Sequence, residues 1–476
     1  MKRREFIKHS GIALTGSLLA PSILTEGFFG SNPFPTNRPP LADRTFTSKS
    51  VEKVLAETKA MIADPEIAWM FENCFPNTLD TTVDYEVIDG KPDTFIITGD
   101  IDAMWLRDST AQVWPYMPFI NEDAELKDLV AGLVNRQVKC IHTDPYANAF
   151  YKDLEKESEW SEDLPDTVPG VHERKWEIDS LCYFIRLSKE YFDLTGDTSV
   201  FDEAWDKAGK AVYNTFVTEQ RKDGTTPYEF VRRTTSMIDG VPFNGKSRPI
   251  KPVGLICSAF RPSDDSTNFP FLIPSNIFAV ISLNQMSEIY SNVYGDDEFA
   301  SMCLSLSEEV NSAIEEYAIA EHLDFGRMYA YEVDGFGNKI YMDDANVPSL
   351  MSLAYLNPDF KDSEIYQNTR RFLLSDHNPY FLKGKAAEGQ ASPHSGKESI
   401  WPMGIILRAM TSENPDEIKQ CLAWLKATHA DTGFMHESFH KDDPFRFTRS
   451  WFAWANTLFG ELIVNVSKKY PEILSS

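Results

Sequence analysis

The sequence is poor in cysteine and in basic residues, and it lacks long apolar runs. Its six cysteines are spread over 476 residues and form no CxxC pair. This spacing encodes neither a zinc ribbon nor a compact disulfide framework, and we expect most of the cysteines in the core. Lys and Arg number 46 against 72 Asp and Glu, a formal net charge of -26 that repels nucleic acid and anionic membranes. The composition therefore argues against nucleic-acid binding.

The first residues carry the pattern of an export signal. A twin arginine, Arg3 and Arg4, precedes an apolar stretch from Ile12 to Ala20 that is too short to span a bilayer. This order is typical of the twin-arginine type of signal. We expect a signal over residues 1–22, a Pro-rich tether over 23–47, and export to the periplasm without stable membrane insertion. The alternative is an uncleaved anchor helix.

Helical periodicity dominates the rest of the chain. Apolar residues recur at i, i+3, i+4 and i+7, and few stretches alternate as strands do. A Gly- and Thr-rich stretch, 221–256, is expected to hold a β-hairpin. No linker divides residues 48–476, so we expect one domain there. The predicted helices lie near residues 50–64, 108–118, 123–142, 176–194, 199–219, 275–294, 297–319, 348–356, 361–374, 398–411, 415–429 and 450–468. Start signals are Asp123 for 123–142, the capping oxygens of Asp197–Ser199 for 199–219, and Pro415 for 415–429.

Every second predicted helix follows a loop crowded with carboxylates, Arg, Trp, Gly and Pro. This alternation predicts an all-α fold, a closed ring of six helical hairpins whose inner helices all start at one end. The decorated loops would then meet in one large polar site. The alternative is an ordinary helical domain with polar loops. The six loops are GDIDAMWLRDST (99–110), RKWEIDS (174–180), FRPSDDSTNFPFLIPSN (260–276), YMDDANVPS (341–349), ASPHSGKESIWPM (391–403) and GFMHESFHKDDPFRFTRSW (433–451).

The last of these loops contains HExxH, from His436 to His440. In zinc peptidases the two histidines share one helical face and the glutamate is the base. Here the motif lies between Gly433 and Pro444, which leaves barely two helical turns. We therefore expect that the histidines do not share a face, and a zinc peptidase is retained only as a rival function.

Adjacent carboxyl groups, Asp264 and Asp265, stand in the third loop beside Arg261. Because neighbouring carboxylates repel, one of them can hold a proton and serve as a general acid. With a separate base such as Glu437, it would supply the two groups that break a glycosidic bond. The alternative is that the pair caps the next helix or balances Arg261. Calcium binding by Asp100 and Asp102, or by Asp343 and Asp344, is a further alternative.

Five of the loop motifs together resemble glycoside hydrolase family 125, the bacterial exo-acting α-1,6-mannosidases. They are GDIDAMWLRDST, FRPSDDS with LIPSN, YMDDANVPSL, SPHSG with IWPM, and HESF with FTRSWFAW, in an order that covers nearly all of the chain after about residue 45. The resemblance implies an (α/α)6 barrel with minor β-hairpins, hydrolysis with inversion, a mannose-containing oligosaccharide as substrate, and neither metal nor other cofactor. A glucoamylase-like exo-glycosidase and a non-catalytic glycan-binding protein are the remaining rivals.

The resemblance also assigns roles within these motifs. RPSDDS supplies the general acid, for which Asp264 is favoured over Asp265, and HES supplies the general base, Glu437. An inverting enzyme holds two such carboxyl groups roughly 6.5 to 9.5 Å apart. The sequence does not indicate an oligomeric state. The residues expected to bind the sugar are Trp105, Arg107, Asp108, Asp179, Arg261, Asp265, Asn276, Asp344, Asn346 and His394.

Overall fold

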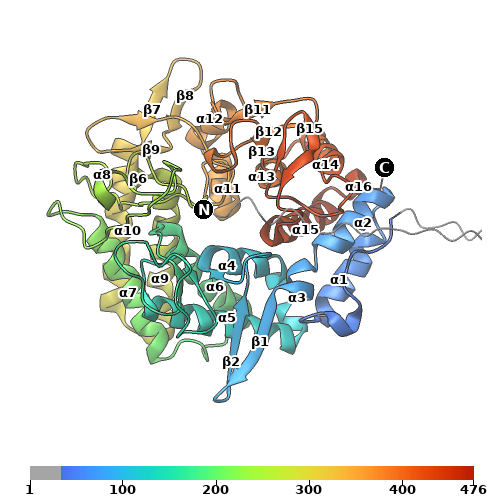
Figure 1. Ribbon diagram of the computed structural model, residues 1–476, viewed down its shortest axis with the longest axis horizontal. Helices are drawn as coiled ribbons and strands as arrows, with labels where there is room; N and C mark the ends of the chain where they lie inside the picture. The colour runs from blue at the N-terminus through green and yellow to red at the C-terminus, as the bar shows by residue number, and fades with distance from the viewer. Residues whose placement is uncertain (1–33, 476) are drawn as a thin grey trace, which may run out of the picture. The chain divides into compact units, whose positions relative to one another are not determined.

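Helices make up about half of the residues that the computed structural model describes, 34–475, and the sheets among them are small (Figure 1). Residues Thr36–Ser476 group into one unit. The predicted export signal, residues 1–22, and the first part of the predicted tether lie outside the described residues. Among the described residues, no helix has both the length and the apolar character that a membrane crossing requires.

The twelve predicted helices are confirmed, and they form two alternating sets. The outer set, as we call it, is α1 (Lys49–Lys59), α5 (Ala124–Thr143), α7 (Glu203–Glu219), α10 (Asp297–Tyr317), α12 (Glu364–Leu373) and α14 (Pro415–Ala427). The inner set is α4 (Leu106–Val113), α6 (Ile178–Thr195), α9 (Ile273–Ile289), α11 (Leu353–Leu356), α13 (Pro402–Met410) and α15 (Ala453–Lys469). Each decorated loop leads into a helix of the inner set.

The two sets differ in burial and in neighbours. Helix α13 buries seven of its nine residues, whereas α14 buries four of thirteen, so the inner helix is enclosed and the outer one keeps a solvated face. Inner helices contact one another in the pairs α4–α6, α6–α9, α9–α11, α13–α15 and α15–α4. Figure 1 shows this succession, and α5, α10 and α14 pack on the inner helices α6, α9 and α13. Helices that follow one another along the chain thus become neighbours in space.

Side-chain caps begin several helices where the sequence predicts them. The Asp123 carboxylate accepts the backbone N–H groups of Glu125 and Leu126 at the start of α5, and Pro415 opens α14. The predicted start of α7 at Asp197–Ser199 is wrong by several residues. Asp202 caps that helix instead, because Asp197 forms its own turn with the N–H of Ser199 and pairs with Lys127.

Among residues 34–475, four further helices were not predicted, and five other helical turns lie outside, beside or within the predicted ranges, with η3 inside 275–294 and η2 overlapping 108–118. Their apolar positions are too few to give a periodic signal. The helices are α2 (Pro65–Cys74), α3 (Asn77–Thr81), α8 (Pro242–Gly245) and α16 (Pro471–Leu474). The turns are η1 (Leu41–Asp43), η2 (Trp114–Glu122), η3 (Tyr290–Tyr294), η4 (Pro358–Asp362) and η5 (Pro393–Ser395).

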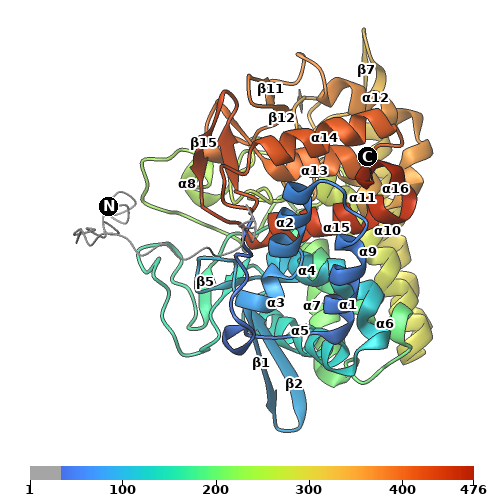
Figure 2. The same cartoon turned by 90° about the vertical axis from the view of Figure 1, so that its right-hand side faces the viewer.

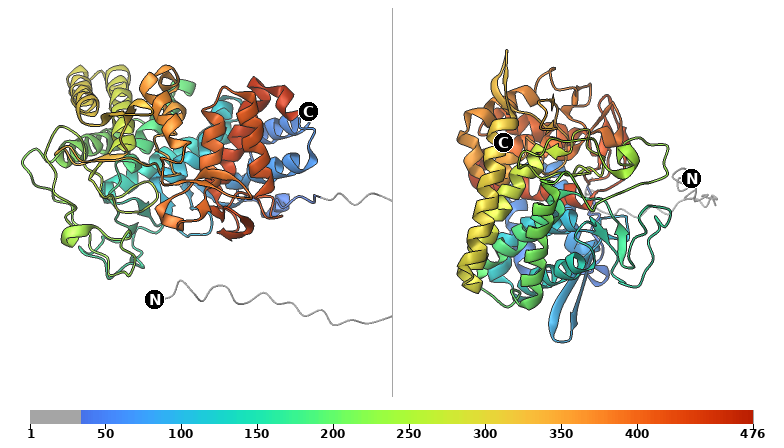
Figure 3. Two further views of the ribbon diagram at one scale, coloured as in Figure 1. Left: turned by 90° about the horizontal axis from the view of Figure 1, so that it is seen from above. Right: turned by 90° about the vertical axis from the view of Figure 1, so that its left-hand side faces the viewer.

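Small antiparallel sheets lie where the decorated loops enter the inner helices. Strand β3 ends where α4 begins, and β6 ends where α9 begins, so each short ladder fixes the first turn of an inner helix. In Figure 2, β5, α8 and β15 lie on the left of the helices. The right-hand view of Figure 3 looks from the opposite direction, so this side of the molecule is on the right there. The sheets are β1 (Val83–Ile88) with β2 (Lys91–Ile96); β3 (Met104–Trp105), β4 (Ala149–Phe150) and β5 (Val171–Glu173); β6 (Phe271–Leu272), β9 (Glu332–Val333) and β10 (Lys339–Ile340); β7 (Ile319–His322) with β8 (Gly326–Tyr329); β11 (Phe381–Lys383) with β12 (Glu388–Gln390); and β13 (Ser399–Ile400), β14 (Ser438–His440) and β15 (Asp443–Thr448).

The β-hairpin predicted within 221–256 is wrong. This stretch contains α8 and an isolated bridge of Val231 to Leu164, but no pair of strands. Its backbone groups pair with other segments instead, as where the Ile238 carbonyl accepts the N–H of Ser266 at 2.7 Å. The stretch therefore lies against the loop that carries Asp264.

The later part of the predicted tether lies against the helices. Arg38 donates to Asp80 through Nε at 2.7 Å and also pairs with Glu52, and its side chain is 6% exposed. Asn37 donates to the carbonyl of Thr432 at 2.8 Å. From Thr36 onward this segment thus contacts residues from the early part of the chain, such as Glu52 and Asp80, and from its late part, such as Thr432.

Candidate active site

Arg107 joins three of the decorated loops. It lies in the first turn of α4, and its Nη1 donates to Glu177 at 2.5 Å and to Asp179 at 3.2 Å, just before and within the first turn of α6. Its Nη2 donates to Asp264 Oδ1 at 3.2 Å, in the loop before α9. Arg107, Glu177 and Asp179 are fully buried or nearly so. One guanidinium therefore holds three carboxyl groups together, two from the start of α6 and one from the loop before α9.

Asp264 is surrounded by hydrogen-bond donors. Asn148 Nδ2 donates to its Oδ1 at 3.3 Å, and the Lys175 ammonium donates to its backbone carbonyl at 2.9 Å. Burial raises the pKa of Asp264, but the charges of Lys175 and Arg107 outweigh burial and hold that pKa well below its usual range. Its backbone φ is +66°, a left-handed conformation that is uncommon for a residue other than glycine and is often found at functional sites.

Glu177 is a member of this cluster that the sequence analysis missed. It is completely buried, it shares a hydrogen bond with Asp264, and Asn148 Nδ2 lies 3.4 Å from its Oε1. Burial raises its pKa far above the usual range and the Arg107 charge only partly opposes this, while the charges of Asp264 and Asp179 raise it further. The pKa of Glu177 is thus raised and that of Asp264 lowered, so the two shifts favour a proton on Glu177 rather than on Asp264. The loop RKWEIDS was recognised, but nothing local distinguishes this glutamate from its acidic neighbours.

Asp265 has a different set of partners from Asp264. Its Oδ1 accepts from His394 Nδ1 at 2.9 Å, and its Oδ2 is buried without a hydrogen-bond partner in the described part of the chain. Burial lowers the pKa of His394, but the hydrogen bond and charge of Asp265, with the charges of Glu437 and Asp264, raise it to about 9. His394 is therefore cationic at neutral pH. The adjacent aspartates thus have separate cationic partners, Arg107 for Asp264 and His394 for Asp265.

The loop before α11 brings Asp344 and Asn346 to the same region. Asp344 accepts from the Ser263 hydroxyl at 2.7 Å and lies 3.4 Å from Asn346 Nδ2. Burial raises the pKa of Asp344, although Arg261 opposes this. The adjacent Asp343 accepts the backbone N–H groups of Leu350 and Met351, both at 2.9 Å, and so supports the loop rather than facing the site.

Glu437 is held by a single long contact. Its Oε1 lies 3.7 Å from Nη1 of Arg449, and its side chain is 15% exposed. Arg449 also donates to the Thr98 carbonyl at 2.9 Å and pairs with Asp100, so it joins the last decorated loop to the first. Burial raises the pKa of the neighbouring Asp108 to about 6, with Arg107 and Arg449 opposing. Arg449 is a second site residue that the sequence analysis did not single out.

Three predicted sugar-binding residues are engaged mainly by protein. Arg261 donates to Glu332 on β9 at 2.7 Å, and removing either buried partner would cost about 3–5 kcal/mol. The Asn276 amide bonds the backbone of Ile256 and Leu272. The Trp105 ring is 6% exposed and packs edge-on to His172 at 5.2 Å. These side chains form the walls of the site.

The HExxH residues do not lie on a helix, and this agrees with the expectation from the sequence that the two histidines do not share a helical face. Strand β14 begins within the motif, His436 Nδ1 donates to the Arg449 carbonyl at 3.0 Å, and the His436 ring stacks on Phe447. His440 contacts Glu398 at 3.3 Å. The two imidazoles therefore serve different neighbours, and the motif contributes only its glutamate to the site.

A helix-rich chain whose inner helices start at clustered carboxyl groups has the character of an α/α-barrel-type glycosidase. The fold is similar to that of the family 78 rhamnosidase of Bacillus sp. GL1, with a TM-score of 0.51, 13% identity, and coverage of 91% of this chain and 36% of that one. Residues 64–464 match the model of glycoside hydrolase family 125, the metal-independent α-mannosidases. The chain belongs to this family, and its activity is that of an α-mannosidase.

Two relatives cover almost the whole chain. A family member from Streptococcus pneumoniae, solved as a non-productive substrate complex with α-1,6-mannobiose, is 40% identical with a TM-score of 0.85 and covers 89% of this chain and 100% of its own. The meiotically up-regulated gene 157 protein of Schizosaccharomyces pombe is 38% identical over 458 residues, 92% of this chain and 90% of that protein. The resemblance drawn from the five motifs is thereby confirmed.

Proposed function

We propose that this protein removes single mannose residues from the non-reducing ends of α-1,6-linked mannosides, with inversion at the anomeric carbon. The observation that carries the proposal is that Asp264 and Glu437, from different loops, both lie close enough to His394 for their charges to raise its pKa, together with Asp265. Two separate carboxyl groups beside one bound sugar are what an inverting glycosidase requires. The α-1,6 linkage is supported by the mannobiose bound to the Streptococcus pneumoniae relative.

The general acid in this proposal is Asp264, supplied with a proton by Glu177. A general acid must be protonated, whereas Lys175 and Arg107 keep the pKa of Asp264 low. The hydrogen bond between the two carboxyl groups resolves this conflict, because they share one proton and titrate as a pair. As the glycosidic bond breaks, the one shared proton moves from Glu177 to Asp264 and from Asp264 to the leaving oxygen, which leaves both carboxyl groups ionised.

The general base is Glu437, which takes a proton from the attacking water. Its single contact with Arg449 at 3.7 Å leaves carboxylate lone pairs free for that water. The water attacks the anomeric carbon on the face opposite the leaving group, so the sugar is released as the β-anomer. The separation of roughly 6.5 to 9.5 Å between Asp264 and Glu437 stays a prediction.

Sugar hydroxyl groups are proposed to meet the remaining polar side chains of the site. Asp265 Oδ2 and Trp105 Nε1 are buried and have no hydrogen-bond partner among residues 34–475. Because buried polar atoms are normally paired, this supports a ligand hydroxyl at each. Asp344, Asn346 and His394 are proposed to complete the grip on the terminal mannose.

Exo action requires a binding site that is closed at one end. We propose that the inner set closes into an (α/α)6 barrel between α11 and α13, within a single catalytic domain over residues 48–476. The contacts among the other inner helices support this closure. The twin arginine supports export, most simply to the periplasm, by a signal over residues 1–22 and a tether over 23–47.

A panel of disaccharides tests this function. Linked mannobioses and glucobioses are incubated with the full chain, and proton NMR records the anomer that is released first. We expect hydrolysis of α-1,6-mannobiose with β-mannose as first product. Initial α-mannose would rule out inversion, faster hydrolysis of glucobioses would favour a glucoamylase-like enzyme, and binding without turnover would leave a glycan-binding protein.

A further inference from the structure

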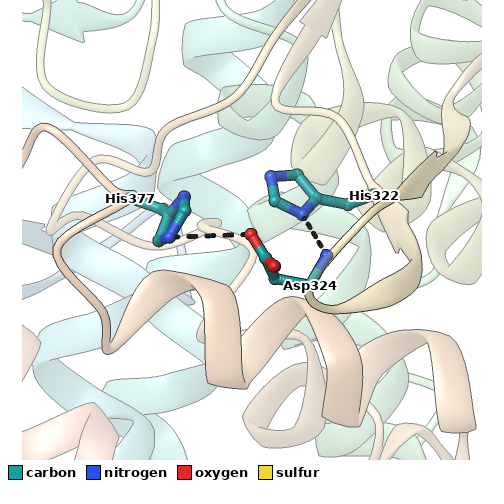
Figure 4. A group of neighbouring side chains, drawn as sticks. All are labelled: His322, Asp324 and His377. Carbon is teal, nitrogen blue, oxygen red and sulfur yellow. Dashed lines mark hydrogen bonds and ion pairs between the residues drawn. The ribbon is translucent and has the colours of Figure 1, made fainter.

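We infer that His322, Asp324 and His377 form a binding site for a zinc-like divalent cation, separate from the catalytic machinery. His322 ends β7, Asp324 lies in the turn before β8, and His377 lies in the loop between α12 and β11. Figure 4 shows the Asp324 carboxylate between the two imidazole rings. One ligand atom from each residue lies within 4.8 Å of the other two.

The ligand types select the class of cation. Two imidazoles and one carboxylate suit Zn²⁺, Ni²⁺ and Cu²⁺, whereas Ca²⁺ and Mg²⁺ take mainly oxygen ligands. A tetrahedral zinc ion with bonds of roughly 2.0–2.1 Å holds its ligand atoms roughly 3.3 Å apart. His377 Nε2 and Asp324 Oδ2 are 3.9 Å apart, and these side chains are 50% and 64% exposed. A small rotation of these exposed side chains therefore closes the site, and a water molecule can fill the fourth coordination position.

The backbone around the three ligands is already held in place. Arg371 donates to the Phe325 carbonyl at 3.3 Å, which ties α12 to the turn that carries Asp324. Phe325 packs against both imidazoles, at 5.1 Å from His322 and 5.3 Å from His377, and Phe372 lies 5.9 Å from His322. Such packing restricts ring motion before a cation arrives, which lowers the entropy lost on binding.

One existing hydrogen bond opposes binding. The backbone N–H of Asp324 donates to His322 Nδ1 at 3.1 Å, which leaves the lone pair of that nitrogen pointing into the turn. A cation bound at Nδ1 replaces this bond. A cation bound at Nε2 requires the proton of the neutral ring to move from Nε2 to Nδ1, which also breaks this bond. We therefore expect binding weaker than at an enclosed structural zinc site, with Kd on the order of micromolar, about −8 kcal/mol.

The bound cation would cross-link two segments of the chain. It would join the β7–β8 turn to the loop after α12, and these segments are otherwise connected through side-chain packing and the Arg371 contact. Because none of the three ligands belongs to the proposed acid, base or sugar contacts, binding is expected to raise thermal stability and leave mannoside hydrolysis unchanged.

Calorimetric titration of the full chain with Zn²⁺ tests the site. We expect one equivalent to bind, and His377→Ala and Asp324→Asn each to weaken that binding more than about tenfold. His142→Ala is the matched control, since this histidine is exposed and lies on α5. A wild-type chain that binds no zinc, or a His377→Ala variant that binds as wild type does, would overturn the inference.

Electron paramagnetic resonance with Cu²⁺ gives a second test that does not depend on affinity. Wild type should show coupling to two imidazole nitrogens, and His322→Ala to one. Unchanged coupling in His322→Ala would assign the copper to other histidines and reject the site. Since α-1,6-mannobiose hydrolysis is measured separately, failure here is distinguishable from failure of the proposed mannosidase function.

Discussion

Asp264 is the proposed general acid and Glu437 the proposed general base, and the protein holds the two carboxyl groups in contrasting ways. Arg107, Asn148 and Glu177 all bond the Asp264 carboxylate, whereas among residues 34–475 the one ion pair of Glu437 is the 3.7 Å contact with Arg449. An acid that must deliver a proton needs neighbours that control where the proton lies. A base that must bind a water molecule needs free oxygen atoms. The crowding of one carboxyl group and the openness of the other are therefore consistent with the two roles.

The largest effect is expected from Glu437→Gln. An amide cannot accept the proton of the attacking water, so kcat should fall about 10²–10⁴-fold, the range typical of a lost general base. The loss should be equal for α-1,6-mannobiose and for an aryl mannoside with a good leaving group, because both need the same water. Glu398→Gln, an acid exposed near His440, serves as control. Near-normal turnover by Glu437→Gln would remove this residue as base.

Asp264→Asn should show the dependence on leaving group that Glu437→Gln lacks. Hydrolysis of mannobiose is expected to fall about 10²-fold or more, and hydrolysis of the activated aryl mannoside much less, since a good leaving group needs little protonation. Asp265→Asn is the matched variant, and it should reduce both rates equally through loss of the His394 contact. If Asp265→Asn shows the leaving-group dependence instead, the two aspartates exchange roles.

Glu177→Gln tests whether the proton of the acid is shared. The pKa of Glu177 is raised in the folded site, so the pair keeps its proton at low pH and loses it as pH rises through that raised pKa. Without Glu177, Asp264 must hold the proton beside Lys175 and Arg107, which lower its pKa. The alkaline limb of kcat/KM on mannobiose should therefore move to lower pH, with the acidic limb in place.

Asp179→Asn is the control for that pH profile. Asp179 also pairs with Arg107 at 3.2 Å, but the bond between carboxyl groups links Asp264 to Glu177. We expect a smaller displacement of the alkaline limb in this variant. An alkaline limb in Glu177→Gln that coincides with wild type would reject proton sharing.

The same raised pKa predicts a difference in stability. A buried carboxyl group with a raised folded pKa stabilises the fold below its unfolded pKa, and this contribution is lost as pH rises through the folded pKa. As pH rises from below the usual pKa of a glutamate through the raised pKa, the melting temperature of Glu177→Gln should consequently fall less than that of wild type. Parallel falls in scanning calorimetry would show that Glu177 does not carry this dependence.

Arg449→Lys should have the smallest effect. Lysine keeps the charge near Glu437, but its single ammonium cannot contact Glu437, Asp100 and the Thr98 carbonyl together. We expect kcat/KM on mannobiose to fall about three- to tenfold, mainly through kcat, with little change in melting temperature. A loss as large as that of Glu437→Gln would mean that Arg449 holds the base much more tightly than a 3.7 Å contact implies.

Features that depend on local sequence were predicted well. The spacing of apolar residues located all twelve long helices, because helix burial repeats every 3.6 residues within a single segment. Caps such as Asp123 were predicted for the same reason, since the carboxylate bonds N–H groups two and three residues away. Strict alternation of decorated and plain loops indicated two sets of helices. Where the local signal was short, as at α3, or misleading, as in 221–256, prediction failed.

The sequence by itself determined the helices, their alternation, the family motifs and the loops that carry the chemistry. Only the tertiary structure decided how those loops share charge. Asp264 and Asp265 are neighbours in the chain, yet they bond Arg107 and His394 respectively, so adjacency in the sequence does not give them the same partners. Glu177 became visible only when folding buried it completely and brought it against Asp264. Burial and long-range charge set a pKa, and neither can be calculated from residues listed in order along a chain.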